Sequence, residues 1–477
     1  MRLLLLLAVI GLFTTGCAEN KVDNGNSQYP DNRPQEEVDN PNAVIYYTTT
    51  DGKRLFPKNH EFEVFNAMVV SNSYDDGIGV LTFDGEVTLI GNGAFYKCTT
   101  LKTIDIPDSV TAIGQTAFAG CENLQNTTIP SNVTSIGLGA FAMCNSITSV
   151  DIPDAVVTID PAAFAYCSNI ERFSGKFATS DGNCLIFDKS LIAFAPAGLS
   201  EYHIPDGIRS IGAYAFANCT NLKHITIPES TIGIGSDSFS DCIGLESITI
   251  PKNVYYISDS AFYNCRNIHK MYCDPIIPPS YSEASGLGRF AEDMVIYVYE
   301  ESIDLYKDND LNYAVYPIMS NGKSLGSLQT TIYYTNIDGR VKPISGIPIK
   351  SHTYGEIVVY GTLPAIPERL FEEYDSLESI VIPDTVYAIL HNAFWGCDNL
   401  QSIIIPNSVI YISDAFGECD NLLSIYCAPT TPPEISYTAL SDIANGCKIY
   451  VPTESVNAYK SAEIWKYYAD HIVGYDF

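Results

Sequence analysis

A spacing of 23 residues recurs through most of this 477-residue chain and constrains its fold more than any other feature. The spacing is kept by three residue types, each at its own place in the repeat. Cysteine marks it at Cys98, Cys121, Cys144 and Cys167, and again at Cys219, Cys242 and Cys265. Proline marks it in three runs: Pro107, Pro130 and Pro153; Pro205, Pro228 and Pro251; and Pro383 and Pro406. Phenylalanine marks it at Phe95, Phe118, Phe141 and Phe164, at Phe216, Phe239 and Phe262, and at Phe371 and Phe394, with Phe416 following after 22 residues. A fixed period of this length predicts stacked structural units that bury a shared core.

One repeat, read from Leu101, is LKTIDIPDSVTAIGQTAFAGCEN. Its opening, L-x-x-I-x-I, places Leu101, Ile104 and Ile106 on the inner side of a short strand. Pro107 should end that strand, because proline has no N–H to donate to a ladder. Phe118 should then close the coil with one large buried ring. A period of 20–29 residues with this opening indicates a leucine-rich repeat, which stacks into a solenoid.

The recurring pattern I-P-x-S-V-x-x-I-G-x-x-A-F-x-x-C resembles the BspA-type leucine-rich repeats of bacterial surface proteins, over about residues 80 to 477. Many members of that family are lipoproteins of anaerobes living on animal hosts. The resemblance implies adhesion to host matrix proteins or to other bacteria. Residues 176–198 look like part of the same family and predict a hairpin inserted between coils, with strands at Cys184–Phe187 and Leu191–Ala195.

The chain is also duplicated on a larger scale. Ile45-Tyr46-Tyr47-Thr48 recurs as Ile332-Tyr333-Tyr334-Thr335, and Ile296-Tyr297-Val298 recurs as Ile449-Tyr450-Val451. We therefore predict a β-rich leucine-rich repeat solenoid of ~23-residue coils in two tandem arrays, residues 43–320 and 321–477. Each array should be closed by a C-terminal cap that turns helical, near Glu301–Tyr306 and Glu454–Lys460, because a terminal repeat must cover its exposed face.

The N-terminus predicts export. Arg2 is followed by an apolar run that is too short to span a bilayer, so residues 1–17 read as a signal peptide. Gly16-Cys17 resembles the lipobox of bacterial lipoproteins, which implies lipidation of Cys17; plain cleavage and secretion is the alternative. Residues 18–42 are polar and should form a disordered tether. We expect an outer-membrane lipoprotein that is exposed at the surface, with a periplasm-facing orientation as the alternative.

Composition and motifs argue against several classes of function. The net charge is −30, without a basic patch, so a nucleic-acid partner is not expected. The sequence contains no H-E-x-x-H, G-x-S-x-G or phosphate-binding glycine loop, and we predict no enzyme activity and no cofactor. The periodic cysteines have neither C-x-x-C spacing nor histidine partners, so we predict no metal site. They should be free buried thiols, although disulfides between neighbouring coils remain metrically allowed.

The remaining candidates for a functional site are exposed residues on the surface of the solenoid. The residue between the two inward-facing isoleucines of each strand should form a stripe on the concave face, namely Asp105, Thr128, Asp151, Thr226, Thr249, Val381 and Ile404. Beside it run Thr103, Asn126, Ser149, His224, Ser247, Ser379 and Ser402. Most of these side chains could equally be plain solvated strand, but Val381 and Ile404 suggest a contact patch. Aromatic residues off the consensus, among them Tyr255, Tyr387, Trp395 and Tyr411, are candidate anchors.

Three hypotheses follow for the function. The first is a non-catalytic, lipid-anchored surface protein that binds a protein partner, either host matrix or other bacteria. The second is a glycan-binding component that serves nutrient capture, which exposed aromatic residues would suit. The third is a periplasm-facing structural lipoprotein. The repeat consensus specifies the scaffold and leaves the identity of the ligand open.

Overall fold

The computed structural model describes residues 40–57, 62–125, 128–258, 260–279, 290–308, 317–325, 329–339, 347, 349–353, 355–440, 443 and 446–477. The chain forms two compact units. Unit 1 comprises Met1–Thr249, Tyr256–Lys270 and Tyr281–Met294; unit 2 comprises Ile250–Tyr255, Met271–Ser280 and Val295–Phe477. Unit 2 thus takes in the last segments of the first array together with the whole second array. The predicted signal peptide, Cys17 and nearly all of the tether lie outside the described residues, as does Asn126.

Each coil consists of one strand, a return path with a shorter strand, and a series of turns. In the repeat that begins at Leu101, β5 (Leu101–Asp105) ends two residues before Pro107, and β6 (Ala112–Ile113) lies on the return path. Leu101, Ile104, Ile113 and Phe118 are all buried, while the side chains between them on β5 face solvent. The predicted inward and outward positions of this coil are therefore confirmed.

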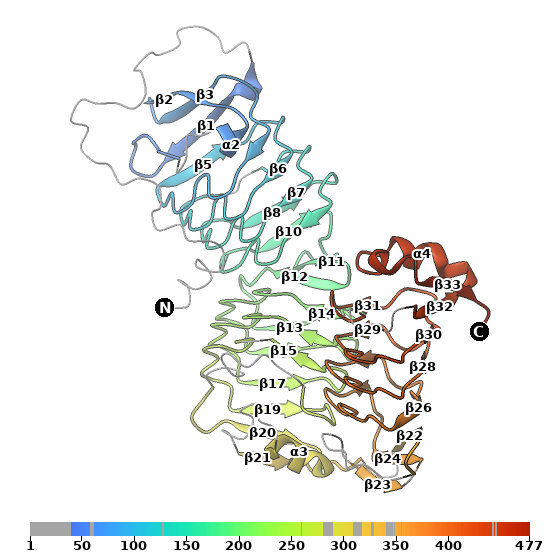
Figure 1. Ribbon diagram of the computed structural model, residues 1–477. Coiled ribbons are helices and arrows are strands. Elements are labelled where there is room, and N and C mark those ends of the chain that lie inside the picture. The colour runs from blue at the N-terminus through green and yellow to red at the C-terminus, as the bar shows by residue number, and fades with distance from the viewer. Residues whose placement is uncertain are drawn as a thin grey trace. The chain divides into compact units, whose positions relative to one another are not determined.

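Unit 1 opens with an antiparallel meander that covers its first coil (Figure 1). Strand order β2-β3-β1-β5 brings β1 antiparallel to β5, with Tyr46 opposite Asp105. The Tyr47 hydroxyl donates to Asn72 Oδ1 over 2.8 Å and accepts from the Leu55 amide over 3.1 Å, which fixes the meander from within. The elements here are η1 (Pro41–Ala43), β1 (Val44–Thr49), α2 (Phe62–Phe65), β2 (Val69–Asp75) and β3 (Ile78–Phe83).

Parallel strands then follow one another coil by coil. On the return side, sheet β4-β6-β7-β9 is followed by a separate sheet β11-β12-β14-β16-β18. The strands on the main side are β8 (Ser149–Ile152), β10 (Arg172–Gly175), β13 (Glu201–His203), β15 (His224–Thr226), β17 (Ser247–Ile250), β19 (Lys270–Cys273), β20 (Val295–Val298) and β21 (Ile318–Ser320). Those on the return side are β4 (Leu89–Ile90), β7 (Ser135–Ile136), β9 (Thr158–Ile159), β14 (Ser210–Ile211), β16 (Gly233–Ile234) and β18 (Tyr256–Ile257).

The predicted hairpin is present, as β11 (Cys184–Phe187) and β12 (Ser190–Phe194). Asp188 and Lys189 between them both have positive φ, as a tight two-residue hairpin turn requires. The hairpin is more than an insertion, because β12 also pairs in parallel with β14 and so begins the next return-side sheet.

Unit 2 repeats this plan around an eight-stranded sheet of order β23-β24-β22-β26-β28-β30-β32-β33, with a return-side sheet β25-β27-β29-β31 (Figure 1). The main strands are β22 (Gln329–Asn336), β23 (Ile349–Thr353), β24 (Glu356–Tyr360), β26 (Leu377–Val381), β28 (Ser402–Ile405), β30 (Ser424–Cys427), β32 (Lys448–Pro452) and β33 (Ile472–Tyr475). The return strands are β25 (Ala365–Ile366), β27 (Ala388–Ile389), β29 (Tyr411–Ile412) and β31 (Glu434–Ile435).

Short helices lie at the two places where the sequence predicts them. They are η2 (Glu300–Ser302) with α3 (Ile303–Asp308), and η4 (Thr453–Ser455) with α4 (Val456–Ser461) and η5 (Trp465–Tyr468). Each helical pair carries a buried tyrosine that hydrogen-bonds to a proline carbonyl: Tyr306 to Pro275 over 2.9 Å and Tyr459 to Pro429 over 2.7 Å. Trp465 Nε1 adds a bond to the Pro433 carbonyl over 2.7 Å.

Columns of stacked phenylalanine rings run through the core. Phe118 lies between Phe95, with a centroid distance of 5.3 Å, and Phe141, with a centroid distance of 5.1 Å, and the three rings are nearly parallel. The same stacking joins Phe216, Phe239 and Phe262 in unit 1, and Phe371, Phe394 and Phe416 in unit 2. The regular spacing of phenylalanine in the sequence therefore corresponds to three separate columns of stacked rings.

The periodic cysteines support these columns from the side. The Cys121 thiol donates to the Phe95 carbonyl of the preceding coil over 3.0 Å. Equivalent bonds come from Cys144, Cys167, Cys242, Cys265, Cys397 and Cys419. These cysteines are free and buried, so the prediction of free thiols is confirmed for them. It is wrong for Cys98, which occupies the same position of the first coil and is disulfide-bonded. Burial raises the pKa of Cys167 to about 12, which keeps its thiol protonated and able to donate.

Two turn positions lie in the left-handed region of φ in the coils of every core phenylalanine from Phe95 to Phe394, and the coil of Phe416 has only the second of them, Glu418. One lies two residues before the core phenylalanine and the other two residues after it. In the coil of Phe118 they are Thr116, with φ of 51°, and Gly120, with φ of 75°. In the coil of Phe141 they are Gly139 and Met143. Glycine fits these positions without strain, and the other residues there carry a local backbone cost.

Candidate binding surface

The predicted stripe of unit 1 faces solvent. Asp105, Thr128, Asp151, Thr226 and Thr249 are all exposed. Four of them follow the period-two alternation of their strands, whereas Thr128 lies outside any strand. The stripe is polar, and part of it is internally hydrogen-bonded, because the Ser174 hydroxyl donates to Asp151 Oδ1 over 2.5 Å from the next strand. This part of the stripe has the character of ordinary solvated strand.

The same position in unit 2 is apolar. Val381 and Ile404 lie directly opposite each other on β26 and β28, and their side chains are 60% and 59% exposed. The residues on either side of each in sequence are buried, so both side chains must point outward. Neither side chain could point inward instead, because successive residues of a strand point to opposite faces, and turning Ile404 inward would expose Ile403 and Ile405.

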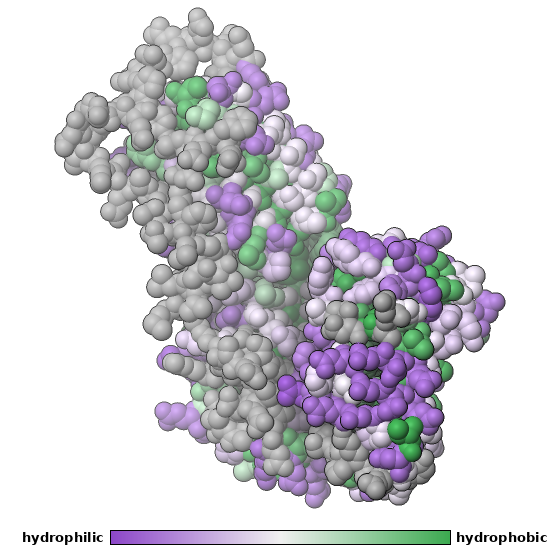
Figure 2. Space-filling view, viewed as in Figure 1, coloured by the Kyte–Doolittle hydropathy of each residue, from purple (hydrophilic) through white to green (hydrophobic). Residues whose placement is uncertain are grey.

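The strand register extends this pair into a row across six strands, which we call the apolar row. Its members are Tyr333, Val381, Ile404, Tyr426, Tyr450 and Val473. Tyr333 is 54% exposed and Val473 is 38% exposed. On the face seen in Figure 2 the described surface of unit 2 is mainly hydrophilic, and its hydrophobic residues show as small separate areas.

The C-terminal end of the row is an aromatic cluster. Tyr426 and Tyr450 stack face to face with a centroid distance of 4.7 Å. Tyr475 meets both rings edge-on, at 5.2 Å and 5.7 Å, and contacts Phe477 at 5.1 Å. The ring faces that Tyr426 and Tyr450 present to each other are therefore occupied within the protein.

A second row, which we call the hydroxyl row, lies beside the apolar row, two residues earlier on the parallel strands and two residues later on antiparallel β22. It consists of Thr335, Ser379, Ser402 and Ser424. The Thr335 and Ser379 hydroxyls lie 2.8 Å apart and share a hydrogen bond. The next strand continues this row with Lys448, which pairs with Ser424. The apolar row is thus flanked by hydrogen-bonding groups, and protein-binding surfaces commonly combine an apolar centre with a polar rim in this way.

The aromatic anchors predicted on the return side form packing contacts. Tyr255 stacks on Tyr411 at 5.5 Å and lies 6.3 Å from Tyr387, whose hydroxyl donates to the Asn253 carbonyl. All three pack on a small cluster of Ala365, Ala388 and Leu390. Burial raises the pKa of the Tyr255 hydroxyl well above its usual value. Trp395 is half-buried and lies over Gly417. These four rings are placed as structural contacts and not as free anchors.

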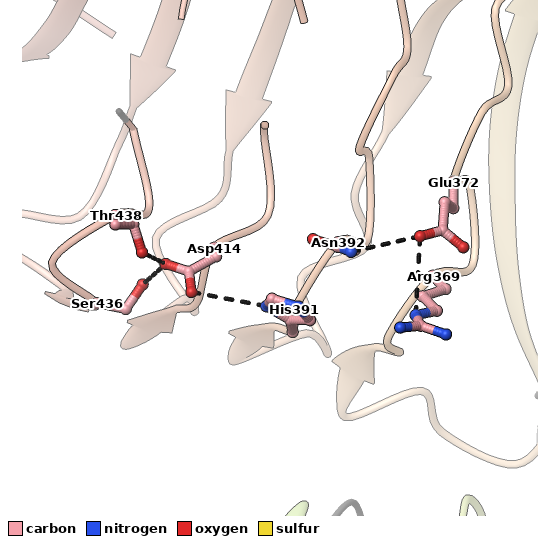
Figure 3. Close-up of polar contacts among 7 residues, drawn as sticks. All are labelled: Arg369, Glu372, His391, Asn392, Asp414, Ser436 and Thr438. Carbon is pink, nitrogen blue, oxygen red and sulfur yellow. Dashed lines mark hydrogen bonds and ion pairs between the residues drawn. The ribbon is translucent and has the colours of Figure 1, made fainter. Parts of the chain in front are cut away.

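A cluster of polar side chains on the return side of unit 2 is the arrangement most like a reactive site (Figure 3). Asp414 accepts from the Ser436 hydroxyl over 2.5 Å and from the Thr438 hydroxyl, and its other oxygen lies 3.6 Å from His391 Nδ1. Serine, histidine and aspartate are all present, but both partners contact the carboxylate. A catalytic triad needs histidine between serine and aspartate, so this cluster cannot activate the serine in that way.

The neighbouring contacts in Figure 3 continue the same column of side chains. Asn392 Nδ2 donates to Glu372 Oε1 over 3.3 Å, and Arg369 Nε lies 3.7 Å from that oxygen. The Asn392–Glu372 and His391–Asp414 contacts join successive coils and so stabilise the stack, whereas the Arg369–Glu372 pair lies within one turn. Within the described part of the chain, no three or more His, Cys, Asp or Glu side chains gather in a way that could hold a metal. None of the described helices has the length and apolar character of a membrane span.

Sequence reasoning identified Val381 and Ile404 but missed the rest of the apolar row. Tyr426 and Tyr450 each stand between two inward-facing residues, which is the signal that identified Val381. Tyr333 also stands between two buried residues, Ile332 and Tyr334, but it belongs to no 23-residue repeat and joins the row through antiparallel pairing of β22 with β26.

The comparisons with known proteins agree with this architecture. The model of the BspA type leucine rich repeat region matches residues 75–184, 190–279 and 354–462, in six copies, which together cover more than half of the chain. No match was found among curated proteins.

Three solved structures are similar in fold. A leucine-rich repeat protein from Bacteroides ovatus is 19% identical, over 85% of this chain and 90% of that one, with a TM-score of 0.31. A leucine-rich repeat protein from Eubacterium ventriosum is 19% identical, over 71% and 81%, with a TM-score of 0.37. A leucine rich cell surface protein from Faecalibacterium prausnitzii is 18% identical, over 87% and 99%, with a TM-score of 0.26.

Proposed function

Because the chain belongs to the BspA-type leucine-rich repeat family, we propose that it is a non-catalytic binding protein that holds a protein partner on the main sheet of unit 2. The observation that carries the proposal is the apolar row, in which Val381 and Ile404 are about 60% exposed side by side in the middle of a regular sheet. Aliphatic side chains in such a place gain free energy when a partner covers them.

The aromatic cluster favours a protein partner over a glycan. Sugar rings are bound by open aromatic faces, whereas Tyr426 and Tyr450 stack on each other and Tyr475 packs edge-on against both. The middle of the row is aliphatic, and aliphatic groups offer a sugar no hydrogen bond. A protein surface with apolar side chains suits both parts of the row. Glycan capture is the second candidate, and Tyr333, which is 54% exposed, is the observation in its favour.

The direct test is binding of the full-length protein to a panel of host matrix proteins, bacterial surface proteins and glycans. The same panel is repeated with the double variant Val381→Asp/Ile404→Asp. The matched control is Thr226→Asp/Thr249→Asp, which puts the same two charges at the equivalent exposed positions of the first array. Circular dichroism spectra of all three proteins should agree, since every substituted side chain faces solvent.

We expect saturable binding of a protein ligand that the double variant loses and the control keeps. Covering Val381 and Ile404 should contribute about 2–4 kcal/mol, since each side chain is about 60% exposed and full burial is worth about 1.5–3 kcal/mol. The affinity should therefore fall roughly 30- to 700-fold. Equal loss in the variant and the control, or binding that both retain, would refute the apolar row as the binding site.

Export and anchoring form a separate part of the proposal. Residues 1–17 would direct export, Cys17 would carry the lipid, and residues 18–42 would tether the units outside the cell. Metabolic labelling with palmitate should mark the wild type and not Cys17→Ser. Protease treatment of intact cells should then release units 1 and 2, whereas protection of the chain would favour the periplasm-facing structural role.

A further inference from the structure

The coils that carry the apolar row also carry a column of carboxylates. In each coil the residue that follows the periodic cysteine position lies in the turn before the main strand. In unit 2 these residues are Asp375, Asp398 and Asp420, and all three are exposed. Asn399 Nδ2 donates to the Asp375 carbonyl over 2.6 Å and Asn421 Nδ2 to the Asp398 carbonyl over 2.8 Å, so the turns stack in register. We call these three residues the acidic rim.

The acidic rim is specific to unit 2. The equivalent residues of unit 1 are Thr99, Glu122, Asn145, Ser168, Thr220, Ile243 and Arg266, with one acid and one base among seven. Among the described residues, the ion pairs do not include any carboxylate of the acidic rim. Carboxylates on neighbouring coils repel one another, and a cationic partner would relieve that repulsion.

In the coils of β26, β28 and β30 the acidic rim lies in the turn before the main strand, and the hydroxyl row and the apolar row follow on the strand itself. In one coil they are represented by Asp398 in the turn and by Ser402 and Ile404 on β28. A partner that covers all three must therefore present basic side chains along one edge and aliphatic side chains along the other.

Resting on the proposed function, we propose that the partner is a basic protein segment whose aliphatic side chains cover the apolar row while its Lys or Arg side chains lie against the acidic rim. A second copy of this chain does not fit, because each copy has a net charge of −30 and presents the same acidic rim. An anionic lipid surface is repelled for the same reason.

The test uses the full-length protein and three immobilised synthetic 20-residue peptides. One alternates Lys and Leu, one alternates Lys and Ser, and one alternates Glu and Leu. The acidic rim is neutralised in Asp375→Asn/Asp398→Asn/Asp420→Asn. The matched control, Asp105→Asn/Asp151→Asn/Glu122→Gln, removes the same number of charges from unit 1.

The Lys/Leu peptide should bind best, and the rim variant should weaken it by at least about tenfold at low salt, with a flatter salt dependence, while the control should not. Val381→Asp/Ile404→Asp should weaken it as well. Equal binding of the Glu/Leu peptide, or equal losses in the rim variant and its control, would overturn the inference. A natural protein ligand that depends on Val381 and Ile404 but not on the rim would overturn it and leave the proposed function standing. A ligand that depends on neither would remove both.

Discussion

Replacing Thr116 by glycine should stabilise unit 1, because this residue combines two local costs. Its φ of 51° lies in the left-handed region, which is unfavourable for a β-branched residue. Its side chain is buried, and Oγ1 has no hydrogen-bond partner among the described residues. The backbone bonds of this turn, from the Thr116 amide to Leu138 and from the Ala119 amide to Thr116, do not depend on the side chain.

The magnitude follows from four contributions. Relief of the left-handed conformation is worth about 1–2 kcal/mol, and removal of a buried unpaired hydroxyl about 1–3 kcal/mol. Against them stand the greater unfolded-state entropy of glycine, about 0.5–1 kcal/mol, and the loss of two buried carbons, Cβ and Cγ2, about 1.6 kcal/mol. The free energy of unfolding should therefore rise by about 1 kcal/mol.

Ala162→Gly is the matched control, because Ala162 is the equivalent buried residue two coils later, with φ of 59° and no hydroxyl. Its gains and losses nearly cancel. Guanidinium unfolding and hydrogen exchange of amides 116–121 in both variants measure the difference. If Thr116→Gly is no more stable than Ala162→Gly, the hydroxyl cost is absent; if it is less stable than the wild type, the reasoning on the left-handed position is wrong as well.

Two further predictions concern the core. Phe118→Ala should lower the free energy of unfolding by about 3–5 kcal/mol, because it leaves a ring-sized cavity between Phe95 and Phe141. Phe118→Leu should lower it by less than half as much, because leucine fills most of that space. Equal losses of the two variants in chemical unfolding would contradict a stacked column. The free thiols should resist alkylation in the native protein at pH 8 and react after unfolding, as followed by mass spectrometry. Burial raises the pKa of Cys167 and of Cys419 from about 9 to about 12, so above pH 9 the folded state keeps protons that the unfolded state releases. The contribution of these thiols to the free energy of unfolding should therefore be complete below pH 9 and be lost between about pH 9 and 12. A denaturant midpoint that does not change over that range would contradict this.

The fold could be predicted from the sequence because its determinants are local and repeated. Leu101, Ile104 and Phe118 each recur with the same period, so one correctly read coil predicts the others. The hairpin at Asp188-Lys189 could be read from strand patterns on either side of a polar turn. The left-handed turn positions were harder to foresee, because glycine marks them in some coils and Thr116 or Met143 occupies them in others.

The candidate surface could be predicted only where the same periodicity reaches it. Val381 and Ile404 follow from strand alternation, and so do Tyr426 and Tyr450 once the closing strands are seen to continue the row. Tyr333 enters the row through an antiparallel pairing with β26 that no repeat encodes. The packing of Tyr255 on Tyr411 joins positions more than 150 residues apart, and exposed and packed tyrosines look alike in a sequence.

The hairpin β11–β12 has a mechanical consequence. On both sides of unit 1 the strand ladders stop at this point: β8–β10 and β4-β6-β7-β9 lie before it, and β13–β15 and β11-β12-β14-β16-β18 continue from it. Among the described residues no strand pairing joins the two sets. The connection there is made by packing, since the hydrophobic cluster that begins at Ile45 extends onto Leu185 and Ala193 of the hairpin. Under a stretching force, such as drag on a tethered protein, adjacent coils within a ladder share the load, whereas this seam does not. Unit 1 should therefore extend in two force steps, with the seam as the first part to yield.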